Sequence, residues 1–322
     1  MTHQHSSALF ALRMKLFIST ILLSLFALSC QSTTANKSNE RQDTPNATLS
    51  NVAANTTNDT ILKHCVYTAT DSAKVVELLK LQPGHDDVLF YARKFKGVPY
   101  VASTLEKKDP EQLIINLKQL DCTTLVETTL ALTMTKRQGE STFEAYCKNL
   151  ETLRYWHGKM NGYLSRLHYF TWWMHDNIDK GLIEHVKDAV HFTAPINVQN
   201  HYMSAHPDKY KFLKAHPEWV DSIKQLEQQY NGPDGFFLPA NKTRLTPKEL
   251  SSIHNGDIVA IVTRKDGIDY SHLGFAVWGK DNHLHLLNAS SIHHKVVEEP
   301  KTLYQYLKEH PSSIGIRLLR LK

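Results

Sequence analysis

The sequence predicts an α+β domain in which helices come first and an antiparallel sheet follows. Between residues 61 and 230 the apolar residues recur mostly at helical spacing. From residue 256 onward the segments are short, β-rich and separated by turn residues, as in "GDIVAIVTRK" and "SHLGFAVWG". Helices followed by a meander of consecutive strands favour one domain with an antiparallel sheet over two separate domains.

Apolar spacing and end signals predict helices at residues 71–81, 86–97, 122–137, 141–156, 167–180, 217–230 and 302–310. Asp71 and Asp86 are the expected caps of the first two, and Gly181 ends the helix that starts at residue 167. A turn and extended loop is expected before the third helix, at residues 97–106, followed by a short strand at residues 111–117. The C-terminal strands are predicted at residues 256–265, 271–279, 283–290, 295–299 and 313–321.

The first residues have the pattern of a targeting segment. Met14 and Lys15 precede an apolar run at residues 16–28, which is too short to be a comfortable membrane span. The run ends on Cys30 in "ALSC", which resembles a bacterial lipoprotein signal, although Ala27 stands where leucine is usual. We expect residues 1–30 to be a lipoprotein signal peptide, with Met14 as an alternative start and a lipid on Cys30. An ordinary signal peptide cut nearby is the alternative.

Residues 31–60 consist mainly of Ser, Thr, Asn and Ala, with almost no large apolar side chains. Such a segment buries too little surface to offset the entropy lost on ordering. We therefore predict a disordered tether at residues 31–60 and a folded catalytic domain at residues 61–322.

The composition is that of a soluble globular protein, with 41% hydrophobic and 21% charged residues. The formal net charge of +5 is small. It is compatible with binding to an anionic surface such as a cell wall, but it does not indicate nucleic-acid binding. The sequence has no Walker loop and no dinucleotide-binding glycine fingerprint. We expect no nucleic-acid partner.

The predicted domain contains Cys65, Cys122 and Cys147. In an oxidising compartment two of them can be bridged, and an odd count leaves one thiol over. Pairing Cys65 with Cys147 would leave Cys122 free, but the sequence does not show that these two are close.

Cys122 is the candidate nucleophile because it stands at the start of the helix at residues 122–137, directly after Asp121, a good N-cap. There the free backbone N–H groups and the helix dipole stabilise a thiolate, and a lowered thiol pKa is what a cysteine nucleophile needs. The alternative is that Cys122 is a small, buried, apolar side chain.

His272 is the candidate base because it opens the strand at residues 271–279. Alternation puts His272, Gly274 and Ala276 on one face, where the small residues would let a helix approach closely. If the next loop has an odd number of residues, such as 278–282, Asn288 lies opposite His272 and can orient the imidazole.

These residues, in this order, resemble the papain-like cysteine peptidases of the NlpC type, and within them the N-acetylmuramoyl-L-alanine amidase-like group. The resemblance spans about residues 85–295 and rests on the segments "GVPYVASTLE", "LDCTTLVE", "SRLHYFTWW", "NGDIVAIVT", "SHLGFAVW" and "LHLLNASS". It implies a papain-like core whose nucleophile, at a helix N-terminus, packs on an antiparallel sheet. Cys122 is then the nucleophile and His272 the base. The third position falls on Asn288, where many relatives have histidine.

The resemblance implies a hydrolase that cleaves an amide bond of peptidoglycan through an acyl-enzyme, with the Cys122 backbone N–H as oxyanion donor and no cofactor. N-acetylmuramoyl-L-alanine amidase is the first expectation. A stem-peptide endopeptidase with the same triad and a non-catalytic cell-wall-binding lipoprotein are the alternatives. We expect peptidoglycan or muropeptides as partners and a monomer. The lipid on Cys30 would anchor it on the periplasmic side of a bacterial membrane, the outer one first.

Candidate substrate-binding residues flank this triad. Arg166 and Tyr169 line the cleft on the functional interpretation, since an arginine suits the carboxylates of a stem peptide. On the other interpretation Arg166 forms a structural ion pair. The two tryptophans that follow Tyr169 in the sequence are expected in the core. Tyr100, before the nucleophile, and Ser271, before the base, are further candidates for substrate contact.

Histidines near the C-terminus allow a metal interpretation. His283 and His285 share a strand face and form a possible zinc half-site, with His293 and His294 further along. A zinc amidase would be the rival enzyme class. A third ligand at fixed spacing is missing, so we expect no metal.

Overall fold

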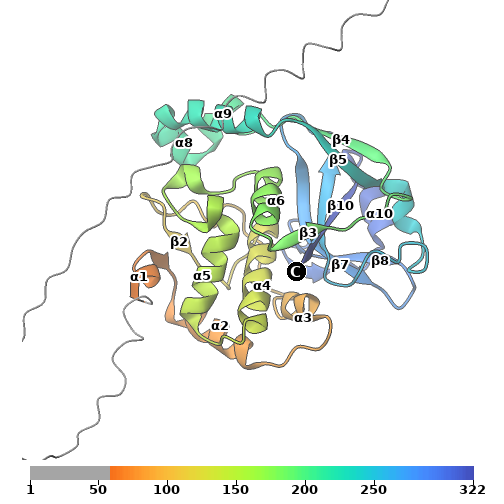
Figure 1. Cartoon of the computed structure of the whole chain (residues 1–322), viewed down its shortest axis with the longest axis horizontal. Coiled ribbons are helices and arrows are strands. Elements are labelled where there is room, and N and C mark those ends of the chain that lie inside the picture. Colours follow the sequence, from red (N-terminus) through yellow and green to blue (C-terminus); the bar gives the residue numbers. More distant parts are fainter. Residues whose placement is uncertain (1–58) are drawn as a thin grey trace, which may run out of the picture. The chain divides into compact units, whose positions relative to one another are not determined.

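Helices occupy the first half of the described chain and strands the second, as the periodicity predicts (Figure 1). The computed structural model describes residues 59–322. The predicted signal peptide lies outside these residues, and so does the tether except for its last two residues. The predicted α+β class with an antiparallel sheet is confirmed.

The helices, in chain order, are α1 (Asp59–Leu62), α2 (Ala69–Lys80), α3 (Asp87–Arg93), α4 (Cys122–Arg137), α5 (Phe143–Arg154), α6 (Phe170–Asp179), α7 (Tyr202–Ala205), α8 (Lys211–Ala215), α9 (Val220–Gln229) and α10 (Leu303–Lys308). Short 3-10 turns connect some of them, at η1 (Trp156–Gly158), η2 (Tyr163–Ser165), η3 (Pro207–Lys209), η4 (Pro217–Trp219) and η5 (Ala240–Arg244). No helix between residues 59 and 322 has the length and apolar character that a membrane span needs.

Two of the predicted caps differ from the structure. Thr68 is the N-cap of α2, and Asp71 is the third residue of that helix; its carboxylate closes a capping box by accepting from the Thr68 backbone N–H. The Asp71 carboxylate also accepts a hydrogen bond from the buried N–H of Leu117 at 3.0 Å. It therefore also links α2 to the segment that precedes α4. Asp86 does precede α3, but its side chain makes no capping hydrogen bond.

The main sheet has eight strands in the order β4 (Ala194–Val198), β5 (Gly232–Pro239), β10 (Ser313–Leu321), β6 (Ile258–Thr263), β7 (Tyr270–Trp278), β8 (Leu284–Ser290) and β9 (Lys295–Glu298), with β3 (Ile183–His185) also paired to β10. All of its pairings are antiparallel. A separate parallel pair joins β1 (Cys65–Val66) and β2 (Leu113–Ile114). The sequence did not predict β3, β4 and β5, which enlarge the sheet at one edge.

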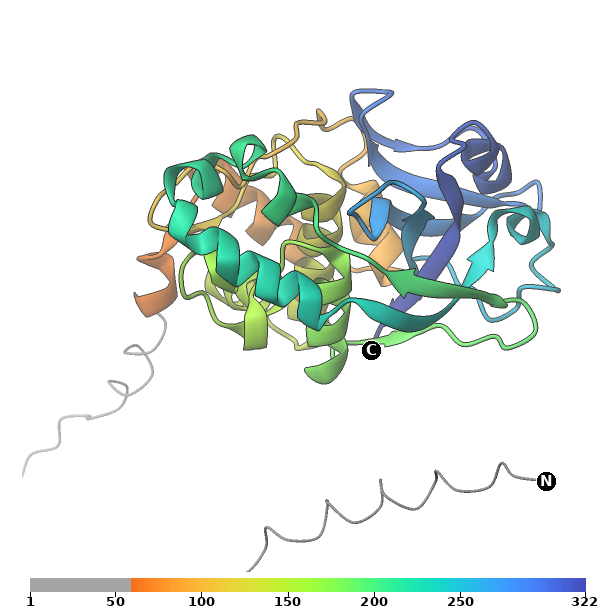
Figure 2. The same ribbon diagram turned by 90° about the horizontal axis from the view of Figure 1, so that it is seen from above.

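The two faces of the sheet carry different cores, and Figures 1 and 2 show the early helices on one side and α10 on the other. Alternation along β7 puts Leu273, Phe275 and Val277 into the larger core with α4, α5 and α6. Ala276 joins the smaller core with Leu303 and Leu307 of α10. The larger core also contains both tryptophans that follow Tyr169 (0% and 2% exposed), which confirms their predicted burial.

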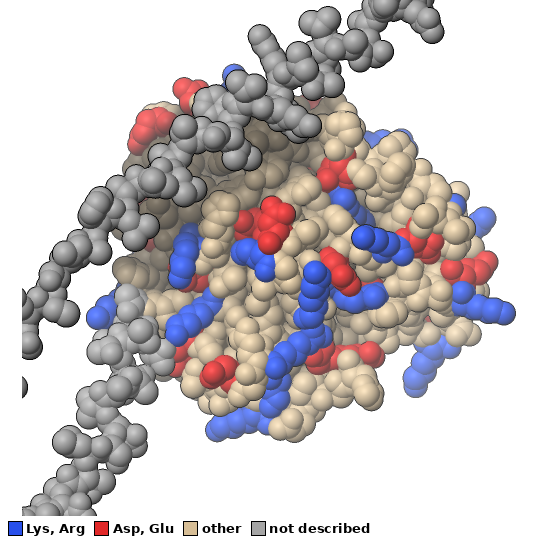
Figure 3. All heavy atoms as spheres, in the orientation of Figure 1, with Lys and Arg blue, Asp and Glu red and all other residues tan. Residues whose placement is uncertain are grey.

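Acidic and basic side chains of the described residues are interspersed over the face shown in Figure 3. This face therefore carries mixed charge and offers no large single-sign patch of described residues.

Cys65 and Cys147 come together in the fold. Cys65 opens β1 and packs against the larger core, in which Cys147 of α5 is fully buried. One turn before Cys147, the ring of Phe143 lies 4.7 Å from that of Tyr67, between centroids. Contact with the Cys65 thiol is the main cause that raises the pKa of the Cys147 thiol, followed by burial. Both are free thiols in the structure.

We expect an oxidant such as glutathione disulfide to join Cys65 to Cys147 and to spare Cys122. The bond forms by exchange, in which the oxidant takes up the two electrons and the two thiol protons. A non-reducing peptide map should show the two segments linked and Cys122 still open to alkylation. A bridge that includes Cys122, or separate alkylation of all three thiols after oxidation, would contradict this expectation.

Candidate active site

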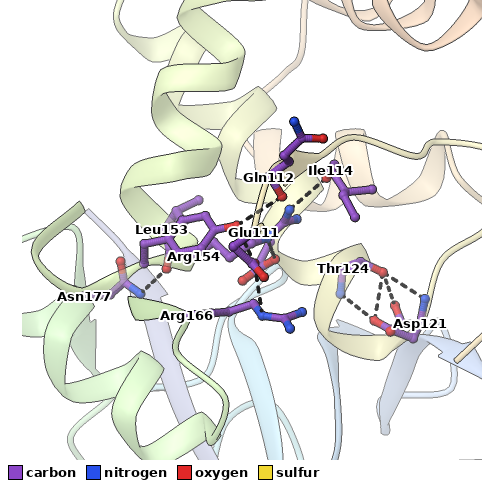
Figure 4. Close-up of polar contacts among 11 residues, drawn as sticks. Glu111, Gln112, Ile114, Asp121, Thr124, Leu153, Arg154, Arg166 and Asn177 are labelled. Atoms are coloured by element: carbon purple, nitrogen blue, oxygen red, sulfur yellow. Dashed lines mark hydrogen bonds and ion pairs between the residues drawn. The ribbon is translucent and has the colours of Figure 1, made fainter. Parts of the chain in front are cut away.

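The start of α4 holds Cys122 in a fixed position. Asp121 is the N-cap, as predicted: its Oδ1 accepts from the backbone N–H of Thr124 at 2.8 Å, and the Thr124 hydroxyl accepts from the Asp121 N–H at 2.9 Å (Figure 4). This reciprocal pair is a capping box. The helix that follows is buried from Thr124 to Thr135, so the thiol stands at the end of a rigid element.

The environment of the thiol differs from the expectation. Cys122 is half-buried. Burial raises the pKa of the Cys122 thiol to about 11, and the carboxylate of Asp121 adds to this rise. The backbone N–H groups of Leu273 and Thr123 act in the opposite direction but are outweighed. The expected lowered pKa is therefore wrong for the resting protein, in which Cys122 is a neutral thiol.

His272 is a neutral imidazole in the same region. Its Nε2 lies 2.9 Å from Oδ1 of Asn288. Burial lowers the pKa of His272, while the hydrogen bond to Asn288 and the charges of Glu299 and Asp121 partly oppose that effect. The ring of Tyr306 in α10 stacks near the imidazole, with centroids 6.5 Å apart and planes at 22°.

The thiol and the imidazole are brought together by shared neighbours. The backbone N–H of Leu273, the residue after His272, donates to the Cys122 sulfur. The carboxylate of Asp121 acts on the pKa values of both Cys122 and His272. Tyr306 contacts the imidazole ring, and its own pKa is raised by burial and then by Glu299 and Cys122. The structure thus groups the N-terminus of α4, the start of β7 and one face of α10.

The predicted contact between Asn288 and His272 is confirmed at 2.9 Å, but the predicted pairing is wrong by two residues. The loop between β7 and β8 runs from residue 279 to 283, because Trp278 pairs with Leu284. Continuing that register puts Asn288 opposite Gly274, so the Asn288 side chain reaches His272 diagonally. Because this loop has an odd number of residues, Asn288 and His272 still lie on the same face of the sheet. At Gly274 a Cβ would stand 2.5 Å from the Leu287 carbonyl oxygen and 3.1 Å from the Asn288 Cβ, so glycine leaves the space that this contact crosses.

A helix does pack over the small residues of β7, as expected, but it is α10 and not the helix that carries Cys122. The helix that carries Cys122 packs with Leu273 and Phe275, on the other face from His272, and Ala276 packs with α10. The register of β6 and β7 shifts beside the histidine: Ile261 pairs with His272 and Val262 with Tyr270. Ser271 is the extra residue of this β-bulge, a feature that re-aims neighbouring side chains.

Sequence reasoning missed Glu299, which follows β9. Its Oε1 accepts from Nδ2 of Asn288 at 2.9 Å, and its Oε2 lies 3.1 Å from Nε2 of His293. Glu299 is 4% exposed. In the sequence it is the second of two glutamates at the end of a short strand, and no local pattern marks one of them as buried.

A cavity of about 450 Å³ lies beside Cys122. Asp121 and Thr123, the two neighbours of Cys122, line it, together with Arg166 and Tyr169. Two of the four predicted substrate residues therefore line the same space as the start of α4.

Arg166 and Tyr169 also have structural partners. The guanidinium of Arg166 lies 2.6 Å from Glu106, and its side chain is 6% exposed. It also lies 3.3 Å from Glu111 (Figure 4). The Tyr169 hydroxyl donates to Glu227 at 2.7 Å and accepts from the Met203 N–H at 2.9 Å. The structural ion pair expected on the second interpretation of Arg166 is present, on the wall of the cavity.

Tyr100 lies near the thiol and does not line this cavity. Its backbone forms an isolated bridge with Leu120, two residues before Cys122. Burial raises the pKa of the Tyr100 hydroxyl, and Cys122 and Asp121 add to the rise.

Residues 91–316 match the N-acetylmuramoyl-L-alanine amidase-like family. A solved N-acetylmuramoyl-L-alanine amidase from Bacteroides uniformis ATCC 8492 is 41% identical in sequence; the match covers 74% of this chain and 99% of that one, with a TM-score of 0.69. The chain belongs to this amidase-like family.

Two other solved structures resemble this family member. One, from Bacteroides fragilis, is provisionally named a xylanase; it is 41% identical, covers 72% of this chain and 100% of its own, and has a TM-score of 0.68. The other, from Legionella pneumophila, shares the fold at 22% identity and a TM-score of 0.59, over 78% of this chain and 94% of its own. No curated protein matches the chain.

Two of the four histidines considered for a metal have other partners in this family member. His285 lies 3.1 Å from Asp281 and 3.0 Å from the carbonyl oxygen of Glu299, and His293 contacts the Glu299 carboxylate. Within residues 59–322, no group of three or more His, Cys, Asp or Glu side chains is arranged to hold a metal ion.

Proposed function

We propose that this protein is a cysteine-dependent amide hydrolase of peptidoglycan, most specifically an N-acetylmuramoyl-L-alanine amidase. The observation that carries the proposal is the position of Cys122 at the first residue of a buried helix, with the backbone N–H of Leu273, the residue after His272, directed at its sulfur. Membership of the amidase-like family and the name of the Bacteroides uniformis relative support the choice of bond. The NlpC-type, papain-like ancestry remains part of this proposal.

The reaction starts from a neutral thiol and a neutral imidazole. Because the pKa of Cys122 is raised and that of His272 is lowered, proton transfer has to accompany attack on the substrate. The sulfur attacks the amide carbonyl carbon while His272 takes the thiol proton. The free N–H of Cys122 at the helix start points at the developing oxyanion, which it stabilises together with the helix dipole.

Collapse of the tetrahedral intermediate breaks the C–N bond. The imidazolium of His272 returns its proton to the leaving amine, and a thioester remains on Cys122. Water then gives a proton to His272 and attacks the thioester carbonyl, and the protonated imidazole reprotonates the sulfur. In the proposed amidase the acyl group is the lactyl group of the sugar and the amine is the first residue of the stem peptide.

The products of a defined muropeptide test the choice of bond. Incubation followed by mass spectrometry should give a sugar with a free lactyl carboxylate and the whole stem peptide. A shortened peptide still attached to sugar would mean the endopeptidase alternative, with the same three residues. Unchanged muropeptide would mean a protein that binds the cell wall without cutting it.

A glycosidase function, which the provisional name of the Bacteroides fragilis structure raises, is less well supported. Glycoside hydrolysis generally needs two carboxyl groups facing one bond. The acidic residues that line the cavity are already engaged: Glu106 pairs with Arg166, Glu127 pairs with Arg154, and Asp121 caps α4. Xylan should therefore remain uncut under conditions that release stem peptide from muropeptide.

The pH dependence of the reaction should follow His272, because the base must be neutral to accept the thiol proton. Burial lowers the pKa of His272 below its ordinary value of 6.5, so activity persists as the pH falls past 6.5 and is lost only at the lower pKa. A profile of kcat/KM against pH should show its acid limb below 6.5. Loss of activity between about pH 9 and 7, around the ordinary thiol pKa of about 8.5, would mean that a preformed thiolate is required instead.

We further propose that Cys30 carries a lipid that anchors the protein on the periplasmic side of a bacterial membrane, where peptidoglycan is accessible. Cys30 lies outside the described residues, so the proposal rests on the sequence pattern alone. The mature protein should partition with membranes, and Cys30→Ser should disturb processing and release the protein, because stable anchoring needs more than one acyl chain. Recovery of unlipidated wild-type protein in a soluble periplasmic fraction would contradict the anchor.

A further inference from the structure

Asn288 lies between two partners that together fix the orientation of its amide. Its Oδ1 faces Nε2 of His272 at 2.9 Å, and its Nδ2 donates to Oε1 of Glu299 at 2.9 Å. Asn288 is fully buried and Glu299 is 4% exposed, which is rare for an acidic residue. The other oxygen of Glu299 lies 3.1 Å from Nε2 of His293, whose side chain is 39% exposed.

These contacts determine which nitrogen of His272 carries the proton. An ionised carboxylate only accepts hydrogen bonds, whereas an amide has one donating and one accepting end. Because Glu299 accepts, Asn288 must turn its NH₂ group towards Glu299 and its oxygen towards His272. That oxygen can only accept, so Nε2 of His272 must be the protonated nitrogen and Nδ1 must hold the free lone pair.

We propose that Glu299 is a positioning residue of the site, which sets the tautomer of His272 through Asn288. The catalytic consequence rests on the proposed function: Nδ1 is then the nitrogen that takes the proton of Cys122. Glu299 itself touches neither the thiol nor the imidazole. It acts through the amide, in the way that outer hydrogen-bond partners orient histidines in other sites.

Glu299 also supplies charge that the neutral Asn288 lacks. When His272 becomes an imidazolium, a carboxylate two hydrogen bonds away favours the charged form. The groups that act on His272 are the Asp121 carboxylate from the start of α4, the Tyr306 ring from α10 and, through Asn288, Glu299. The two carboxylates raise the pKa of His272, whereas burial lowers it.

The test compares Glu299→Gln with Glu298→Gln, a matched change one residue away. Glu298 pairs with Arg93 at 3.0 Å and Lys96 at 3.6 Å on the surface, away from Asn288. Glutamine at 299 keeps the shape but removes the charge and can donate to Asn288, so the amide is free to flip. We expect kcat to fall about 10- to 100-fold with KM little changed, a typical effect for an outer-shell partner. The acid limb of kcat should also move to lower pH, because a charge that favours the imidazolium is gone.

A second readout needs no substrate. Nitrogen-15 NMR of histidine in the wild-type protein should show His272 protonated at Nε2, and Glu299→Gln should add the Nδ1-protonated form. Glu298→Gln should match the wild type in both assays.

Two results would overturn the inference. One is a Glu299→Gln protein whose kcat and acid limb equal those of Glu298→Gln. The other is a wild-type His272 protonated at Nδ1, a result that decides the matter even if Glu299→Gln fails to fold. A wild-type protein that cuts no muropeptide would refute the proposed function instead, and the NMR result would still test the tautomer.

Discussion

Replacing Cys122 with alanine is expected to abolish hydrolysis while leaving the fold intact. The substitution removes the only atom that forms the covalent bond in the proposed reaction, so the rate should fall by about 10⁴-fold or more, as for loss of a nucleophile elsewhere. The side chain is half-buried at the end of α4, and the capping box of Asp121 and Thr124 does not use it. The free energy of unfolding should therefore change by about 1 kcal/mol or less.

The control for Cys122→Ala is Cys65→Ala, which also removes one thiol. Cys65 contacts Cys147 rather than the imidazole, so this variant should keep wild-type activity. Circular dichroism and a muropeptide assay on both variants complete the comparison. Full activity in Cys122→Ala, or loss of wild-type activity on chelation alone, would favour the metal-dependent class of amidase.

Replacing Arg154 with methionine is expected to cause a large loss of stability. Arg154 Nε lies 2.7 Å from Oε2 of Glu127, Nη1 donates to the Ile114 carbonyl at 2.8 Å, and both charged residues are 2% exposed (Figure 4). Without the arginine, the Glu127 carboxylate in α4 is buried without its ion-pair partner. Breaking one partner of such a buried pair costs about 3–5 kcal/mol. Urea unfolding with the midpoint as readout measures the loss.

Two comparisons make this result specific. Arg137→Met breaks the ion pair between Arg137, whose side chain is 38% exposed, and Asp87. This change should lower the free energy of unfolding by about 1 kcal/mol or less. The double change Glu127→Leu with Arg154→Met removes both charges and should recover much of the loss, since a buried pair replaced by apolar groups is often close to neutral. An Arg154→Met protein no less stable than Arg137→Met would contradict the assignment of a buried, paired charge.

Local signals made the position of Cys122 at a helix start predictable. A cap residue before a cysteine, followed by a long apolar helix, fixes where α4 starts and which residue stands first, and both agree with the structure. The pKa of Cys122 was not predictable in the same way. The helix start and the adjacent Asp121 are sequence features, but burial, which is the largest effect, depends on how α4, β7 and α10 pack.

The odd length of the loop between β7 and β8 made it possible to predict on which face of the sheet Asn288 lies. It did not show which residue of β7 pairs with Asn288. Alternation requires only that the loop after β7 have an odd number of residues, and a five-residue loop placed one residue further along the chain satisfies this equally. The actual loop, 279–283, moves the pairing from His272 to Gly274. The position of Glu299 beside the site depends on the pairing of a third strand, β9, and on the diagonal contact between Asn288 and His272. Neither feature leaves a periodic pattern in the sequence. The strand β5 begins with Gly-Pro-Asp-Gly, residues that normally indicate a turn, which is why that edge of the sheet was missed.

Hydrolysis of a defined muropeptide in ¹⁸O-labelled water tests the cysteine amidase account most directly. Attack of water on a thioester between Cys122 and the lactyl group places one labelled oxygen in the new carboxylate of the sugar fragment. We expect mass spectrometry to find this label on the sugar, an unlabelled whole stem peptide, and neither product with Cys122→Ala. A label inside the stem peptide, or labelled products from Cys122→Ala, would contradict the account.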